Sequence, residues 1–139
     1  MQVTVSWGGN ALFVGQSGSG HEVVMDGPPD HGGENKGPRP MEMLLLGVGG
    51  CSSFDVMSIL KKRRQAVSDC VCQVEAQRAD AVPAVFTHIN LHFVVSGDNL
   101  SEKAVEQAVK LSAEKYCSAS IMLQEGGVTI THSHEIVGQ

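Results

Sequence analysis

The feature that most constrains this chain is its longest apolar segment, Gly37 to Arg64, which reads GPRPMEMLLLGVGGCSSFDVMSILKKRR. We interpret the segment as one helix, because Pro40 suits a first helical turn and the basic run Lys61 to Arg64 suits a C-terminal end. A helix of roughly 25 residues is nearly 40 Å long. Its apolar side chains surround the axis instead of forming one stripe, so we expect this central helix to be covered on all sides.

Three glycines lie in the middle of the predicted helix, directly before a cysteine. They are Gly47, Gly49 and Gly50, and Cys51 follows them. Each glycine inside a helix is about 1 kcal/mol less favourable than alanine, so three together require a reason. We expect another backbone to approach closely here, most simply a second helix. This places a thiol on a buried helix beside a tight contact.

Composition limits the classes of function. The 139 residues are 42% hydrophobic and 18% charged with a net charge of −5, which indicates one globular domain, residues 1–139, and argues against nucleic acid or an anionic membrane as a partner. Glu42 and Asp55 interrupt the apolar segment, which argues against a membrane span. The N-terminus, MQVTVSWGG, has no signal-peptide core, so we expect a cytoplasmic protein. In that compartment the four cysteines are expected to be reduced, catalytic or metal-bound.

The part of the chain before the central helix predicts a small sheet and a long loop. Alternating residues and Gly-rich turns indicate three short strands, which are Val3–Trp7, Ala11–Val14 and His21–Met25. Asp26 to Pro38 is rich in Gly, Pro, Asp and Asn and leads straight into the helix. Loops this long in compact domains are usually functional or disordered, and we favour function.

The part after the central helix predicts a hairpin, a second helix and a last strand. The hairpin strands are 68–79 and 86–96, and the second helix runs from an N-cap at Ser101 to about Tyr116. A short apolar turn at 121–123 and a strand at 128–134 complete the chain. The order βββ-α-ββ-α-β belongs to the α+β class.

Two cysteines are the candidates for chemistry, Cys51 and Cys117. A single buried thiol is usually inert packing, because free cysteine behaves as a small hydrophobe. Cys117 lies where one helix ends, and Ser118 and Ser120 are potential caps there, so unpaired N–H groups could favour its thiolate. Asp55, one turn after Cys51, opposes ionisation of the Cys51 thiol. Any activating charge for Cys51 must therefore come from elsewhere.

Two further cysteines, in the sequence Cys70-x-Cys72, share one face of a predicted strand, and we interpret them as buried packing positions. A Cys₂His₂ zinc site is the alternative, built from these cysteines and one of two histidine pairs on neighbouring strands, His88 with His92 or His132 with His134. The GQSGSG stretch from Gly15 lacks the lysine and the following helix of a phosphate-binding loop. We expect no metal and no cofactor.

The sequence around the two candidate cysteines resembles the OsmC/Ohr family. The resemblance lies in PMEMLLLGVGGC, residues 40–51, and in KYCSAS, residues 115–120, and the two cysteines are 66 positions apart. The predicted order of elements extends it over nearly the whole chain. The residues around Cys51 and Cys117 are most similar to those of the YhfA-like branch of the family.

This resemblance implies an α+β fold of the OsmC type around a long buried central helix, in an intertwined homodimer whose central helices pack together. It also implies a cysteine-based peroxidase that reduces organic hydroperoxides. Cys51 would be the peroxidatic thiolate and Cys117 the resolving thiol, and a dithiol reductant would restore the pair.

The sequence departs from the family's peroxidases at two charged positions. Those enzymes have an arginine in the N-terminal sheet and a glutamate directly after the proline of the central helix. Here Met41 follows Pro40, Glu42 is one residue late, and Arg39 is the first arginine of the chain. The alternative is a non-peroxidase relative that binds a small hydrophobic or sulfur-containing ligand at the dimer interface.

Overall fold

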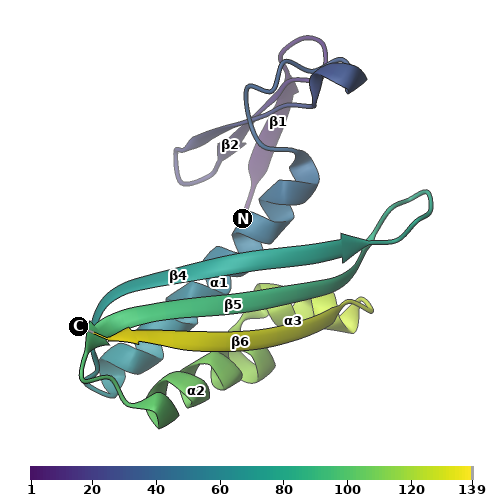
Figure 1. Ribbon diagram of the computed structural model, residues 1–139. Coiled ribbons are helices and arrows are strands. Elements are labelled where there is room, and N and C mark those ends of the chain that lie inside the picture. The colour runs from purple at the N-terminus through teal and green to yellow at the C-terminus, as the bar shows by residue number, and fades with distance from the viewer. Residues whose placement is uncertain (139) are drawn as a thin grey trace. The chain divides into compact units, whose positions relative to one another are not determined.

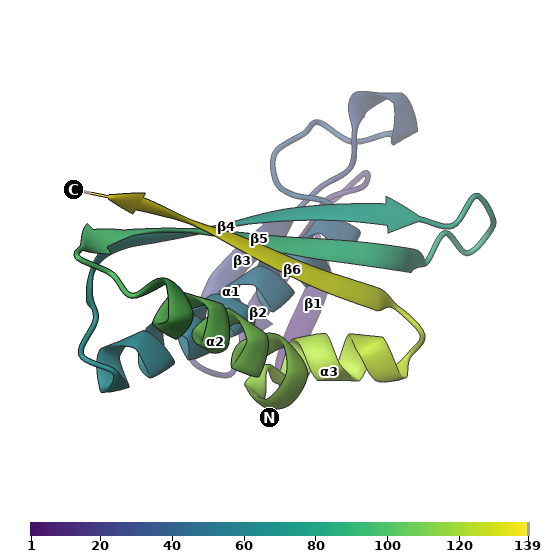
Figure 2. The same cartoon turned by 60° about the horizontal axis from the view of Figure 1, so that its bottom comes forward.

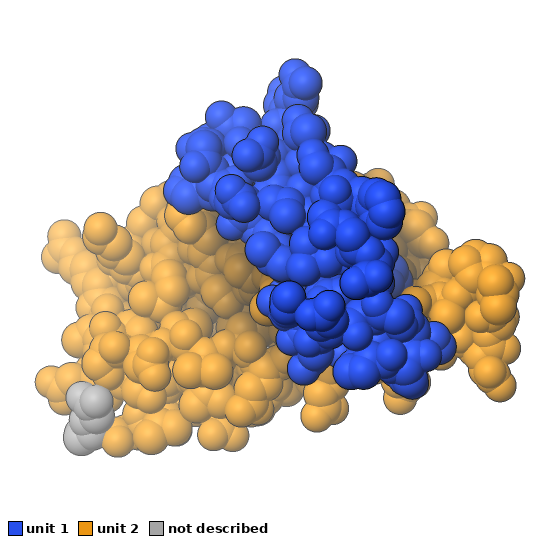
Figure 3. Space-filling view, turned by 90° about the horizontal axis from the view of Figure 1, so that it is seen from above, with its two compact units in different colours: residues 1–44 blue, residues 45–139 orange. Residues whose placement is uncertain are grey.

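The computed structural model describes residues 1–138, which form two compact units, Met1–Leu44 and residues 45–138 (Figure 3). The first unit holds a three-stranded antiparallel sheet in the order β1-β2-β3. Its strands are β1 (Val3–Trp7), β2 (Phe13–Ser17) and β3 (Glu22–Met25). The predicted three-strand meander is thus confirmed. Three of its apolar side chains are largely exposed, with Val3, Val5 and Trp7 at 64%, 57% and 69%.

The predicted loop after β3 is ordered around one buried carboxylate. Asp26 accepts hydrogen bonds from the backbone N–H groups of Gly27, Glu34 and Lys36, at 2.7 to 3.1 Å. These bonds, that from Lys36 above all, hold the pKa of Asp26 below its usual range. The loop contains one turn of 3₁₀ helix, η1 (Pro29–His31). Its backbone is therefore fixed by local bonds, although it has no apolar periodicity.

The central helix, α1 (Pro40–Lys62), begins at the proline and ends inside the basic run, as the sequence predicts. Its first residues belong to the first unit and the remainder to the second. The second unit adds a sheet of three strands, β4 (Ala66–Arg78), β5 (Phe86–Asp98) and β6 (Thr129–Gly138). β4 and β5 form the predicted antiparallel hairpin, while β6 runs parallel to β5, so β5 is the middle strand (Figure 1).

The core of the second unit lies between this sheet and the helices on one side of it (Figure 2). β5 alternates strictly, and Ile89, Leu91, Phe93 and Val95 are almost completely buried. Side chains of α1 and of helix α2 (Glu102–Leu111) complete this core; they are Val48, Val56, Leu60, Val105, Ala108 and Val109. The opposite face of the sheet is polar, with His92 bonded to Ser133 and Glu135.

The connection from β5 to β6 contains more helix than the sequence predicts. Ser101 caps α2 by accepting a hydrogen bond from the Ala104 N–H, as expected. The helix ends at Leu111, however, and Ser112–Tyr116 (η2) forms a wider, π-type turn before Cys117. The predicted apolar turn at 121–123 is wrong, because these residues lie inside a third helix, α3 (Ser118–Glu125). Figures 1 and 2 show α2 and α3 covering the same face of the sheet.

Within one chain, α1 is covered on one side only, so the expected cover on all sides is not provided by the chain itself. Phe54 is 76% exposed and Leu46 61%. The reason that we gave for Gly49 is also wrong, because a side chain of a strand, not a second helix, is its neighbour. A Cβ on Gly49 would lie 3.1 Å from Cγ2 of Val74, whereas nothing lies within 4 Å of a Cβ on Gly47 or Gly50.

The length and mean hydropathy of α1, 1.7 over its most apolar window, would also suit a membrane span. The buried helix of a globular core has the same pattern, and 28% of that window is buried. The packing of α1 against the sheet is the role that the described residues support.

Candidate functional site

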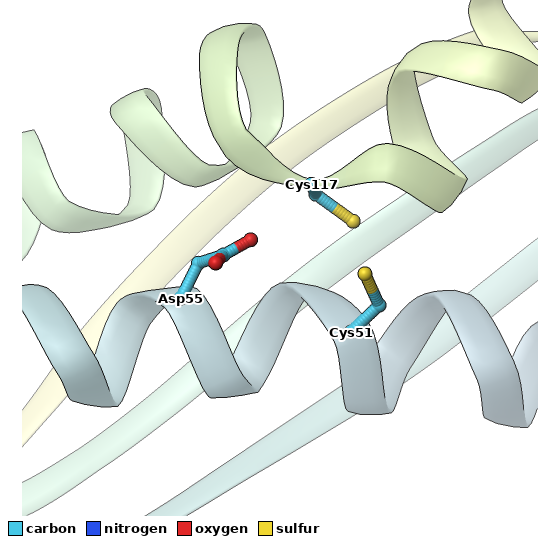
Figure 4. A group of neighbouring side chains, drawn as sticks. All are labelled: Cys51, Asp55 and Cys117. Atoms are coloured by element: carbon cyan, nitrogen blue, oxygen red, sulfur yellow. The ribbon is translucent and has the colours of Figure 1, made fainter.

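The structure brings the two predicted thiols together. Figure 4 shows the sulfur atoms of Cys51, on α1, and Cys117, between η2 and α3, pointing toward each other. The two Sγ atoms and a carboxylate oxygen of Asp55 all lie within 4.8 Å of one another. Cys117 is fully buried and Cys51 half-buried, and no disulfide joins them. Thiols 66 positions apart therefore form one cluster.

Cys117 is held by a network of buried hydroxyl groups. The Ser52 Oγ donates a hydrogen bond to the Cys117 Sγ at 3.1 Å, and the Ser112 Oγ donates to the carbonyl oxygen of Ser52 at 3.0 Å. The Ser120 N–H also reaches the Cys117 Sγ, at 3.3 Å, so Cys117 is the N-cap of α3. Both Cys117 and its partner Ser52 are 0% exposed, which fixes the direction of this thiol.

The ionisation of Cys117 differs from our expectation. The helix-terminal N–H that we expected to favour its thiolate is present, and with the Ser52 hydroxyl it lowers the pKa. Burial acts more strongly in the opposite direction, and the neighbouring Cys51 adds to it, so the pKa of Cys117 is raised overall. Cys117 is therefore a neutral thiol at neutral pH, and it acts as a nucleophile only after losing a proton.

Asp55 is the member of the cluster that sequence reasoning did not place in the site. In the sequence Asp55 is only a charge that opposes a Cys51 thiolate, although its spacing of four residues from Cys51 puts both on one helix face. Burial raises the pKa of the Asp55 carboxyl. Within residues 1–138, no hydrogen bond or ion pair engages this carboxyl.

A hollow of about 310 Å³ adjoins Asp55. It is lined by apolar and basic side chains from α1, α2 and η2, which include Ile59, Lys62, Arg63, Leu111 and Tyr116. Asp55 therefore lines the hollow and also belongs to the thiol cluster. A small organic molecule in this hollow would lie beside the carboxyl.

Cys70 and Cys72 lie on β4 opposite Val95 and Phe93, so they point toward the helices. Burial raises the pKa of both thiols, that of Cys72 to about 11, although a hydrogen bond with Ser53 opposes the shift. Both are half-buried. These properties agree with the interpretation of the two as packing positions.

The alternative zinc site is contradicted by the sheet. On the neighbouring strand β5, His88 and His92 lie on the face opposite to Cys70 and Cys72, because Ile89, Leu91 and Phe93 occupy the helix-covered face. On β6, His132 and His134 lie on the helix-covered face, but β5 separates them from β4, and His134 bonds to Glu102 at 2.7 Å. The cysteines and histidines thus have no common site.

The thiol cluster itself offers three possible metal ligands, Cys51, Asp55 and Cys117. Structural zinc sites use four protein ligands, and their thiols must be deprotonated. A raised pKa of Cys117 does not favour such a site. The cluster suits thiol chemistry better than metal binding.

Arg39 and Glu42 are the residues of this chain that could replace the arginine and glutamate of the family's peroxidases, but each is bonded to other groups. The Glu42 carboxylate accepts a hydrogen bond from the Arg39 backbone N–H at 2.9 Å and so caps the start of α1. The Arg39 guanidinium donates to Asn35 Oδ1 at 2.7 Å and to the Gly37 carbonyl at 3.2 Å. In this arrangement both residues stabilise the loop and the helix start.

Comparison with known proteins agrees with this arrangement. The model of the family described as OsmC-like protein matches residues 33–133. Protein YhfA of Escherichia coli K12 is 50% identical over 137 residues, 99% of this chain and 98% of its own. A hypothetical protein of Aquifex aeolicus is 36% identical with a TM-score of 0.85, over 99% of this chain and 96% of that one.

A more distant structure has the same fold. An organic hydroperoxide resistance protein OsmC from Legionella pneumophila is 18% identical with a TM-score of 0.73, over 96% of this chain and 95% of that one. At this identity the likeness concerns the fold alone. The family match and the identity to YhfA over almost the full length lead to one conclusion: the chain belongs to the family of OsmC-like proteins.

Proposed function

We propose that this protein is a thiol-dependent peroxidase that reduces organic hydroperoxides, with Cys51 as the peroxidatic and Cys117 as the resolving cysteine. The observation that carries the proposal is the contact of these two thiols, which come from separate elements and face each other in a largely buried cluster. Solved structures named as organic hydroperoxide resistance proteins, which share the fold, support it.

The peroxidatic role of Cys51 and the resolving role of Cys117 are assigned from the solvent exposure of the two side chains. Cys51 is half-buried and therefore open to a hydroperoxide, whereas Cys117 is 0% exposed and lies beside the Cys51 sulfur. In the first step the Cys51 sulfur attacks the terminal oxygen of the hydroperoxide, which gives a sulfenic acid and an alcohol. In the second, Cys117 displaces the sulfenic hydroxyl as water and forms the disulfide. A dithiol reductant then returns both thiols by exchange.

The test is mass mapping of the cysteines after treatment with an organic hydroperoxide. Oxidised wild-type protein is expected to contain a Cys51–Cys117 disulfide, with Cys70 and Cys72 still reduced. Cys117→Ser is expected to accumulate a sulfenic acid at Cys51, which a dimedone probe would label. A folded protein whose Cys51 remains a thiol under excess hydroperoxide would contradict the proposal.

That contrary result would favour the second candidate, a non-peroxidase that binds a small hydrophobic or sulfur-containing ligand. Two observations speak for it: Arg39 and Glu42 bond to other groups, and the pKa of Cys117 is raised. The hollow beside Asp55 offers room for such a ligand. Binding of small apolar thiols without turnover would support this candidate.

The active form is proposed to be a cytoplasmic homodimer. Free cysteines suit a reducing compartment. Phe54 of α1 and Trp7 of β1 are exposed large apolar side chains, and Gly47 and Gly50 present open backbone. A second copy of the chain, not lipid or nucleic acid, is proposed to cover these surfaces, with well over 2,000 Å² buried as in obligate dimers.

The glycines of α1 give a matched test of the dimer. Among the described residues nothing lies within 4 Å of a Cβ at position 50, so Gly50→Leu is expected to weaken association while leaving the fold of the protomer intact. Gly49→Leu would instead strike Val74, and should lower stability by about 1–3 kcal/mol through overpacking. Sedimentation and thermal unfolding separate the two effects. A Gly50→Leu protein that sediments like the wild type would place the dimer contact elsewhere.

A further inference from the structure

Asp55 has a position that the two-thiol reaction does not yet use. It follows Cys51 by one helical turn, and its carboxylate oxygen lies within 4.8 Å of the Sγ atoms of both Cys51 and Cys117 (Figure 4). No hydrogen bond or ion pair engages it among the described residues. A half-buried carboxyl without a partner is unfavourable for folding, so its place between two thiols and a hollow requires an explanation.

The groups around Asp55 suit a carboxyl that exchanges a proton. On one side are the two thiols, which are the titratable groups of its cluster. On the other side, Lys62, Arg63 and Tyr116 line the hollow, but no cation of residues 1–138 is paired with the carboxyl. Burial raises the pKa of Asp55 and so brings its protonated form closer to the working pH.

We propose that Asp55 is the general acid–base of the reaction: it accepts the proton of the Cys51 thiol and delivers it to the alkoxide that leaves the hydroperoxide. This inference rests on the proposed peroxidase function and adds a catalytic residue to it. It also explains how the reaction could proceed in a chain where Arg39 and Glu42 serve the loop and the helix start.

The first step is balanced as follows. The Cys51 sulfur bonds to the terminal oxygen of ROOH while the O–O bond breaks, so sulfur loses two electrons and the peroxide gains them. The thiol proton passes through Asp55 to RO⁻, which leaves as ROH. The products are the sulfenic acid and the alcohol, and Asp55 regains its starting state.

The second step uses the same carboxyl. Cys117 transfers its thiol proton to Asp55 and attacks the Cys51 sulfur, and the departing hydroxide takes that proton and leaves as water. One carboxyl can serve both steps because it is near both sulfur atoms. Since the pKa of Cys117 is raised, this thiol has particular need of a base.

The experiment compares two oxidants that differ in their leaving groups. With tert-butyl hydroperoxide the leaving alkoxide needs a proton, whereas with peracetic acid the leaving acetate does not. Asp55→Asn removes both the base that takes the Cys51 proton, which either oxidant requires, and the acid that only the alkoxide requires. It is therefore expected to slow the reaction of Cys51 with tert-butyl hydroperoxide by about 10²–10⁴-fold, the usual contribution of general acid–base catalysis, and the reaction with peracetic acid measurably but less. Asp55→Glu should recover part of the rate, and Glu106→Gln, an exposed carboxyl on α2, should match the wild type.

Rates would be followed by mass mapping of the Cys51–Cys117 pair from pH 5 to 9, and Asp55→Asn should lose one titration from the profile. Equal slowing with both oxidants, or no slowing, would overturn the role of Asp55 while the peroxidase function stands. A wild-type protein that reacts with neither oxidant would instead refute the peroxidase function itself.

A measurement on the wild type alone covers the case in which Asp55→Asn does not fold. Across a series of alkyl hydroperoxides, protonation of the leaving group by Asp55 predicts a weak dependence of the rate on the pKa of the alcohol released. A steep dependence would show that the alkoxide leaves without a proton, which contradicts the inference.

Discussion

The four cysteines form two pairs. The pair that is close in sequence points in one common direction, whereas the pair that is distant in sequence faces each other. Cys70 and Cys72 are two positions apart on β4, yet neighbours on one face of a strand are separated by about 6.6 Å and point the same way. Cys51 and Cys117 are 66 positions apart, yet α1 and the β5–β6 connection direct their sulfur atoms toward each other. Disulfide geometry requires Cβ atoms about 4 Å apart, which suits facing elements and not one strand. Sequence proximity is thus a poor guide to which thiols face each other in this fold.

The largest expected effect is on hydroperoxide consumption, in variants that keep only one of the two cysteine pairs. A protein with Cys70→Ala and Cys72→Ala should consume hydroperoxide like the wild type and form the Cys51–Cys117 disulfide. A protein with Cys51→Ser and Cys117→Ser should lose all consumption, although it keeps two thiols. A coupled assay of hydroperoxide loss measures both, and activity in the second protein would remove the distinction between the pairs.

An effect of intermediate size is expected on the rate at which Cys72 is alkylated. With a pKa of about 11, roughly one Cys72 side chain in a thousand is a thiolate at pH 8. Iodoacetamide should therefore modify Cys72 about two orders of magnitude more slowly than an ordinary peptide thiol with a pKa of about 8.5. Time-resolved peptide mapping checks this rate, with the same protein unfolded in guanidinium as the control. If folding makes no difference to the rate, burial does not control this thiol.

The smallest effect should come from Ser52, whose hydroxyl bonds to Cys117 at 3.1 Å. This bond lowers the pKa of Cys117, so Ser52→Ala should raise the pKa further and slow disulfide closure a few-fold at pH 7. Because the attacking form is the thiolate, closure should speed up with rising pH, and the variant should approach the wild type in alkaline solution. Loss of the bond should also reduce the free energy of unfolding by about 0.5–1.5 kcal/mol.

Stopped-flow measurement of closure after a single hydroperoxide addition tests the Ser52 prediction. Ser53→Ala serves as the control, since Ser53 bonds to Cys72 of the other pair. Equal slowing in both variants would mean that the serines act through the packing of α1 and not through the thiols.

Local pattern was sufficient to predict most elements of the fold. The alternation at Val3 to Trp7, the cap at Ser101 and the limits of α1 are all encoded in nearby residues, and each prediction was confirmed. α3 was missed because its stability is partly nonlocal: the Gln124 side chain bonds to the Ala113 carbonyl, eleven positions earlier. The parallel direction of β6 was not predicted either, since alternation does not encode strand direction.

The candidate site was only partly predictable. The two thiols were singled out from their sequence context, but their contact depends on tertiary packing. Asp55 was recognised as a neighbour of Cys51 and not as a member of the site, because its distance from Cys117 could not be obtained from the sequence. The ionisation of Cys117 was misjudged for a similar reason: the capping N–H was visible in the pattern, whereas the depth of burial was not.

The parallel pairing of β5 and β6 has a consequence for this site. Parallel strands must be joined by a crossover, and the hand of the crossover decides which face of the sheet it covers. Here the crossover consists of α2, η2 and α3 and carries Cys117 over the face that α1 occupies. A crossover of the opposite hand would put Cys117 behind the sheet, out of reach of Cys51. The chain topology thus brings the two thiols to the same face of the sheet, and the hydrogen bonds of Ser52 and Ser120 then fix the direction of Cys117 within it.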